Sequence, residues 1–426
     1  MSASPQAPAG WASDRRSPAA VLTGAVLSLA AATAAATDYE FDPRVELAGG
    51  YDDNVNFAVS GANKIGAADA YGDVRADLIA REPNWQWRLT PEVRGTWYPS
   101  QSDFDQNSEF LYLNGQRTGE RYALGLDGYG SSQTLLPTYL PTANLGTGLG
   151  VSEPGTTLVA PANIRQNVGY LSPSYTFEMT TRSSFELKAG YNDTTYSREI
   201  EGGYDDFKNA TGSAALVLRA TPTGTIALRA VAADFRPDFG FTTNTYGGEL
   251  EWDGKFSPTK QYYLRVGGGR TDFSGTVAGT PEPTGSTNWW GGAGTQWTYT
   301  LTEIFLDATR AVAPTEEGYS VNQDQLRLRL ARRFTPRLAG FLGARTIYQE
   351  PIGAAVVLNE RAQHYNYATA GFEWRLEREF SLIAAYNFTD YHYAAASATS
   401  QANSIRVSIV YEPHRPEQGP AITVGY

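Results

Sequence analysis

Apolar and polar residues alternate with a period of two in many segments between positions 44 and 411. The clearest segment runs from Trp85 to Trp97, where six of the odd-numbered positions are apolar, one is glycine, and the even-numbered positions are polar or charged. The same alternation recurs around Leu250, Leu328 and Trp374. Because successive side chains of a β-strand point to opposite faces, this pattern predicts strands with one apolar and one polar face.

The segment from Trp85 to Trp97 carries tryptophan near both ends of its apolar face. A bilayer favours this arrangement, because aromatic residues gather at both membrane interfaces, whereas a soluble sandwich has no such requirement. Each charged residue of the other face would cost about 2–4 kcal/mol at the bilayer midplane if it faced lipid. These residues must therefore line an interior. The pattern predicts an all-β fold, namely a transmembrane antiparallel up-and-down β-barrel.

Short turns alternate with longer loops rich in Gly, Ser, Asp and Pro between the predicted strands. Short periplasmic turns and long extracellular loops are typical of outer-membrane barrels. Eight short turns separate nine hairpins, which predicts about 18 strands, with 16 as the second choice, and both termini in the periplasm. The predicted turns occupy residues 81–84, 117–120, 180–183, 221–224, 256–259, 301–302, 334–337 and 376–379.

The first 36 residues are typical of a secretory signal peptide. Arg15 and Arg16 supply its basic part, residues 19–29 its apolar part, and residues 34–36 the small side chains before the cleavage site. We expect a signal peptide over 1–36 and a mature barrel over 37–426, delivered to the outer membrane of a Gram-negative cell. Residues 421–426 end on an aromatic residue, as barrel assembly signals do, and form either the closing strand or a periplasmic tail.

Composition narrows the classes of function. No apolar run of about 18 residues follows the leader, which excludes helical membrane spans. Cysteine is absent and the formal net charge is -11, so a thiolate site and a nucleic-acid partner are not expected. The three histidines are scattered, with His364 on the apolar face of its strand and His392 in a loop. We expect no catalytic residues, no metal and no cofactor.

The predicted inner face carries charges of both signs, together with tyrosines that could stack on sugar rings or belong to the membrane interface. Glu249, Glu251 and Asp253 form an acidic ladder, which we interpret as a solvated inner face rather than a cation site. The longest loop is expected from Ser131 to Ile164. Its apolar content predicts either a loop that constricts the barrel or caps its mouth, or a surface loop that packs only on neighbouring loops. The residues predicted along the inner path are Arg75, Arg88, Glu92, Arg94, Glu249, Glu251, Arg327, Arg329, Tyr365, Tyr367 and Arg375.

The segment Gly-Tyr-Asp-Asp-Asn-Val at residues 50–55 ends the first predicted strand. Together with the barrel pattern, it resembles the family of outer-membrane β-barrel porins found in exopolysaccharide operons, including the EpsL-like proteins. The resemblance implies an outer-membrane barrel associated with polysaccharide export, and it implies no catalytic residues. We expect Asp53 and Asn54 to shape the start of a loop through side-chain bonds to the backbone rather than to bind a ligand.

Our main functional expectation is a water-filled channel that takes part in exopolysaccharide export. Its expected partners are outer-membrane lipid, the barrel assembly machinery, polysaccharide and periplasmic export proteins. A general or sugar-selective diffusion porin is the alternative. A plugged structural or adhesive barrel and a barrel enzyme are further rivals, and the enzyme would need fewer strands and a Ser/His site. Neighbouring genes for glycosyltransferases and a polymerase would favour export.

Overall fold

The computed structural model describes residues 38–58, 63–135, 164–197, 205–275, 285–315, 319–353, 363–393 and 398–413. Its regular structure in this part of the chain comprises eighteen strands and one short 3-10 helix, η1 (Ser102–Phe104). The strands are β1 (Asp38–Asp52), β2 (Ala67–Glu82), β3 (Trp85–Trp97), β4 (Gln106–Thr118), β5 (Tyr122–Leu135), β6 (Ile164–Thr180), β7 (Ser183–Tyr196), β8 (Phe207–Thr221), β9 (Gly224–Pro237), β10 (Thr242–Ser257), β11 (Lys260–Ser274), β12 (Ser286–Thr298), β13 (Thr302–Pro314), β14 (Ser320–Arg333), β15 (Leu338–Pro351), β16 (Gln363–Arg375), β17 (Phe380–Tyr393) and β18 (Ala398–Tyr411).

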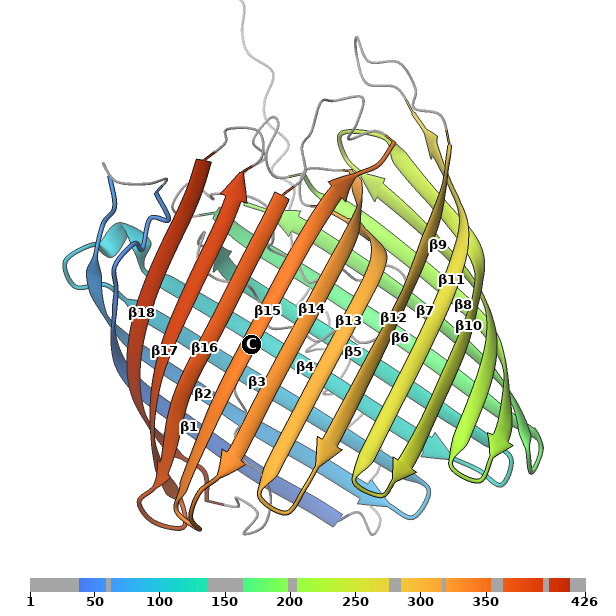
Figure 1. The fold of residues 1–426 in the computed structure, drawn as a ribbon, viewed down its shortest axis with the longest axis horizontal. Coiled ribbons are helices and arrows are strands. Elements are labelled where there is room, and N and C mark those ends of the chain that lie inside the picture. Colours follow the sequence, from blue (N-terminus) through green and yellow to red (C-terminus); the bar gives the residue numbers. More distant parts are fainter. Residues whose placement is uncertain are drawn as a thin grey trace, which may run out of the picture.

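The strands form one closed antiparallel sheet (Figure 1). Each strand pairs with the next one in sequence, and β18 returns to pair with β1 over residues 404–411 and 45–52. Closure satisfies the backbone groups that an edge strand would leave unpaired, which is a requirement for a sheet in hydrocarbon. The fold confirms the predicted up-and-down barrel and the count of 18 strands rather than 16.

All eight predicted short turns are present, and two to four residues separate the strands that each turn joins. They gather at one end of the barrel, the lower end in Figure 1, which we call the turn end; the opposite end is the loop end. Three register shifts lie at the turn end, next to Thr180, Thr221 and Ser257. The assignment of the turn end to the periplasm remains a prediction.

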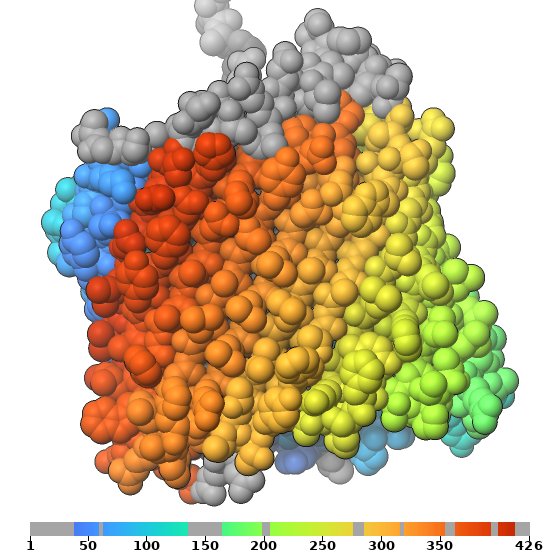
Figure 2. Space-filling model, in the orientation of Figure 1, coloured from blue at the N-terminus to red at the C-terminus, as the bar shows by residue number. Residues whose placement is uncertain are grey.

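The two faces of the wall differ as the alternation predicts. Large exposed apolar side chains occupy the outer face, where Val93 is 58 % and Leu228 64 % exposed. The neighbouring Glu92, on the inner face, is only 3 % exposed. Figure 2 shows the outer face as a continuous wall in which the strands follow one another in sequence order. So much exposed apolar surface is unfavourable in water and fits hydrocarbon.

Three expectations about chain position are corrected or left open. Residues 131–135 belong to β5 and Ile164 begins β6, with Gln133 paired to Gln166, so the segment between these two strands is 136–163 rather than 131–164. His392 lies inside β17, directly opposite His364, rather than in a loop. The strand that closes on β1 is β18. Residues 421–426, the predicted signal peptide and the loop 136–163 lie outside the described residues.

Candidate functional site

The eleven residues predicted along the inner path all occupy inner-facing positions of their strands. The register places Arg75 beside Glu92, and Arg94 beside Asp73. Tyr367 lies beside Arg345. The structure joins several of these residues into three charged clusters. Their part in passing a solute stays a prediction.

The first cluster, the β1–β3 cluster, consists of Arg44, Glu46, Asp73, Glu92 and Arg94. Arg44 Nη2 lies 2.6 Å from Glu46 Oε2, and Arg44 Nη1 lies 3.5 Å from Asp73 Oδ2. Arg94 donates to Glu92, and its Nε is 3.8 Å from Asp73 Oδ2. The side chains of Asp73 and Glu92 are 5 % and 2 % exposed. Two guanidinium groups thus compensate carboxylates that would be costly to bury alone.

The second cluster, the β9–β11 cluster, contains the acidic ladder. Arg229 Nη2 donates to Glu251 Oε2 at 3.1 Å, and its Nε lies 3.6 Å from Glu249 Oε1. Arg265 Nε lies 3.6 Å from the other oxygen of Glu249. Arginines from both neighbouring strands therefore stand where a metal ion would have to bind. Within the described ranges, no group of three or more His, Cys, Asp or Glu side chains is placed to hold a metal ion.

The third cluster, the β13–β15 cluster, centres on Asp307, whose side chain is 3 % exposed. Arg327 donates to Asp307 Oδ1 from Nε at 2.9 Å and from Nη2 at 2.8 Å, and Tyr263 donates its hydroxyl to the other oxygen. Arg329 Nη2 donates to Glu303 Oε1 at 2.7 Å. The strand geometry thus fixes each arginine against a carboxylate on β13.

Arg345 extends this cluster and lies directly across from Arg327 on the neighbouring strand. Two guanidinium groups in this position repel each other unless a neutral or acidic group lies between them. The amide of Gln325, with its oxygen turned to Arg345, accepts from Nε at 2.7 Å and from Nη2 at 2.9 Å. Gln325 therefore helps to hold a like-charged pair on the inner wall.

Each of the three clusters carries both signs of charge, so the inner wall is not divided into one acidic and one basic side. Five of the eleven predicted path residues lie outside these three clusters, namely Arg75, Arg88, Tyr365, Tyr367 and Arg375. Arg88 is exposed and Arg75 is half-buried, and neither forms an ion pair with another described residue. They are the cations of the predicted path that are most open to a passing anion.

Several inner tyrosines are packed into the wall rather than presented to a solute. Tyr365 is 5 % exposed and packs with Tyr391, Phe57 and Ile347. Tyr129 is 2 % exposed and lies 5.2 Å from the ring of Tyr112, in a second aromatic cluster. Tyr367 is partly buried and donates its hydroxyl to Asn387. The sequence alone did not separate tyrosines that stiffen the wall from those open to the lumen.

The segment after β1 covers part of the inner wall near the loop end. Asn54 is fully buried and donates to the backbone oxygens of Gln401 at 2.8 Å and Ala58 at 3.1 Å. Asp53 accepts from the backbone and side-chain nitrogens of Asn403 at 2.7 and 2.8 Å. Phe57, at a positive φ of 47°, then packs against inner-facing side chains of β15–β18. These bonds agree with a loop-shaping role for Asp53 and Asn54.

Three functional candidates on the inner wall escaped the sequence reading: Arg229, Asp307 and Arg345. Asp307 follows Ile304-Phe305-Leu306, a continuous apolar run that hides the alternation of β13. Arg345 stands among small residues, which give little contrast between faces. Because alternate residues of a strand share a face, Asp307 lies on the same face as Glu303, four positions earlier, and this spacing could have identified it. The closeness of Arg345 to Arg327 depends on strand register and needed the structure.

Among the described residues, no helix is long and apolar enough to cross a bilayer. No family model and no curated protein matches the chain in sequence. Solved structures with a similar fold include a BenF-like porin from Pseudomonas fluorescens Pf-5, at 9% identity and a TM-score of 0.48, covering 88% of this chain and 98% of that chain. Another is Pseudomonas aeruginosa OccK2 (OpdF) in complex with glucuronate, at 8% identity and a TM-score of 0.45, with coverage of 88% and 98%.

The outer membrane channel DcaP of Acinetobacter baumannii is similar at 10% identity and a TM-score of 0.43, covering 89% of this chain and 98% of that chain. Likeness at this level carries no argument about function.

Proposed function

We propose that the chain is a diffusion channel of the outer membrane of a Gram-negative cell. The observation that carries this proposal is the opposite chemistry of the two faces of one closed barrel. The outer face is apolar and exposed, and the inner face holds ion-paired arginines and carboxylates from β1 to β14. A barrel with an apolar outer band and a polar interior can span a bilayer and enclose a water-filled channel.

The chemistry of the inner wall favours a water-filled path rather than a dry, plugged interior. A barrel of 16–18 strands is wide enough to leave a channel of water. Arg88 and Asn114 face each other across β3 and β4, and both are exposed on the inner face. Exposed charged groups are stable there only if water solvates them. The path therefore suits small polar solutes of either charge.

Exopolysaccharide export, our main expectation from the resemblance, is the finer and second proposal. The inner tyrosines that would stack on a sugar chain lend it little support, because Tyr129 and Tyr365 are buried in aromatic clusters. A general or sugar-selective porin fits the mixed-charge wall better. Under either proposal the barrel assembly machinery and outer-membrane lipid are partners; periplasmic export proteins are partners only in export.

The test is solute flux through the purified full chain in phospholipid vesicles. We expect vesicles that carry the protein to swell in solutions of a monosaccharide or a disaccharide, while vesicles with heat-unfolded protein do not. Swelling no faster than in protein-free vesicles would contradict the channel. A strain that lacks the gene tests export separately: retention of polymer in the periplasm supports export, and normal secretion with slower solute uptake supports the porin.

A further inference from the structure

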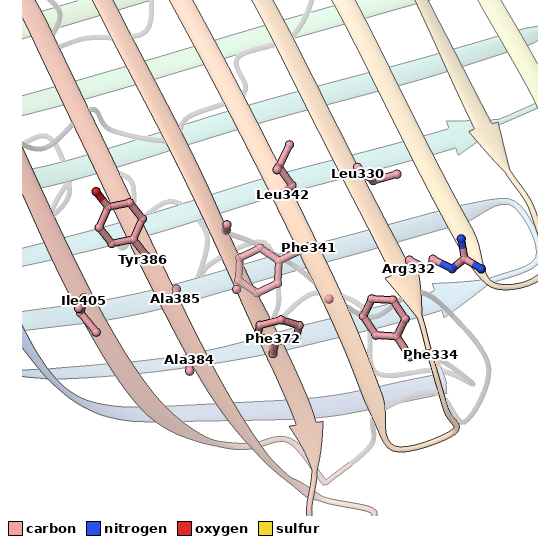
Figure 3. Close-up of a pocket in the computed structure, with 13 residues that line it drawn as sticks. Leu330, Arg332, Phe334, Phe341, Leu342, Phe372, Ala384, Ala385, Tyr386 and Ile405 are labelled. Carbon is pink, nitrogen blue, oxygen red and sulfur yellow. The ribbon is translucent and has the colours of Figure 1, made fainter.

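A depression of about 690 Å³ lies on the outer face of β14–β18, near the turn end (Figure 3). Its volume is within the range of about 300–1,000 Å³ that is typical of pockets for small ligands. The depression exists because three neighbouring strands place small residues at outward positions: Gly340, Ala370 and Ala384. Larger apolar side chains surround them, as Phe372 and Ile405 do in Figure 3.

One charged residue, Arg332, is among the thirteen that line the depression, and it lies at the edge beside Phe334 (Figure 3). Arg332 is the second-last residue of β14, so its guanidinium stands close to the turn end of the barrel. It is exposed and forms no ion pair within the part of the chain that the structure describes. An apolar depression with a single uncompensated cation at its rim is complementary to an amphiphile with an anionic head.

The dimensions fit one leaflet of a bilayer. From Phe380, where β17 begins at the turn end, to Tyr386, on the far side of the depression, is a distance of six residues. At about 3.3 Å per residue and a tilt of about 40°, these six residues rise roughly 15 Å. The apolar band of an outer-membrane barrel is about 25 Å tall, so the far side of the depression lies a little beyond the middle of the band, measured from the turn end.

A second depression on the outer face also contains an arginine, but the charge of that arginine is compensated. It is lined by Arg310, Trp289 and other residues nearer the loop end. There Arg310 Nη1 donates to Asp324 Oδ2 at 2.8 Å, and the guanidinium lies 4.7 Å from the Trp289 ring centre. Its charge is already compensated, so this depression offers no anion site.

We propose that the depression at Arg332 is a binding site for one phospholipid, with its phosphate on Arg332 and an acyl chain over Gly340, Ala370 and Ala384. The inference rests on the proposed membrane location and adds a specific lipid to it. Arginine suits a phosphate because its planar donors match the phosphate oxygens. The site lies in the leaflet of the turn end, which is the periplasmic leaflet if the predicted orientation holds.

The test is native mass spectrometry of the full chain in detergent, titrated with phosphatidylglycerol. We expect wild-type protein to hold one lipid. Arg332→Gln should lower the lipid affinity about fivefold, because one cation at the membrane surface contributes that much to the binding of an anionic lipid. Ala384→Leu should lower the affinity about tenfold, because the larger side chain fills the depression. Two matched controls should bind as the wild type does: Ala230→Leu adds the same volume on the outer face of β9, and Lys260→Gln removes an outward cation at the turn end of β11.

Equal binding by all four variants would overturn the site. A dimer of the chain that Ala384→Leu dissociates would also overturn it, because the depression would then be an interface between copies. Solute flux is measured on the same wild-type preparation. Flux without lipid retention contradicts the lipid site alone, and lipid retention without flux contradicts the channel alone.

Discussion

Leu216 and Val217 are adjacent residues of β8 that face lipid and lumen respectively, and they offer a sharp test of the register. Leu216 is 40 % exposed on the outer face and lies five residues above Thr221, the last residue of the strand. At about 3.3 Å per residue and a tilt of about 40°, this places it roughly 13 Å above the turn end. That height is near the centre of an apolar band about 25 Å tall.

Leu216→Arg should therefore reduce the free energy of unfolding by about 2–4 kcal/mol, the cost of an arginine at the bilayer midplane. Val217→Arg should cost less than about 1 kcal/mol, because its side chain faces the lumen, pairs across with Ser184, and has Glu186 two positions away on the same face. The assay is urea unfolding of the protein in phospholipid vesicles, followed by tryptophan fluorescence and gel mobility. An equal cost at both positions, or a larger cost at Val217, would refute the assignment of faces.

Three further outcomes are expected. Asp307→Ala should destabilise the barrel by about 3 kcal/mol in the same unfolding assay, because it removes a buried carboxylate that accepts two hydrogen bonds from Arg327, whereas Arg88→Ala should change stability by less than about 0.5 kcal/mol; similar losses would show that the ion pair is solvated. Phe57→Gly should raise conductance without loss of folded protein, since glycine accepts the positive φ and uncovers the inner wall; unchanged conductance would place Phe57 outside the path. A cysteine at Pro222 should resist an impermeant thiol reagent in intact cells and one at Phe239 should react, and the reverse labelling would invert the topology.

The barrel was largely predictable because it depends on local features of the sequence, namely the alternation within each strand and the short turns between strands. A strand between water and lipid must alternate polar and apolar side chains, as residues 85–97 do, and short turns cannot join strands other than neighbours. The strand count followed from these turns. Boundaries were less certain, because pairing extends strands beyond the alternating core: Leu135 and His392 are in strands because a neighbouring strand pairs with them.

The sequence predicted which residues line the inner wall, but it did not predict which of them contact one another. Alternation placed Glu249 and Arg327 on the inner face, yet their partners depend on register between strands. The contact between Phe57 and Tyr365 joins residues 308 positions apart, through a segment whose path no periodicity predicts. The local sequence thus predicts which face of the wall a side chain points to, but it does not predict which residues that side chain contacts.

The channel itself is tested most directly by single-channel recording of the purified full chain in a planar lipid bilayer. The structure predicts stepwise current increments in potassium chloride, with weak selectivity between cations and anions because each charged cluster of the inner wall holds both signs. The same increments should persist when the chain is purified from a strain that lacks its resident porins. Folded, bilayer-inserted protein that carries no current under these conditions would contradict a water-filled path and leave a closed structural barrel in its place.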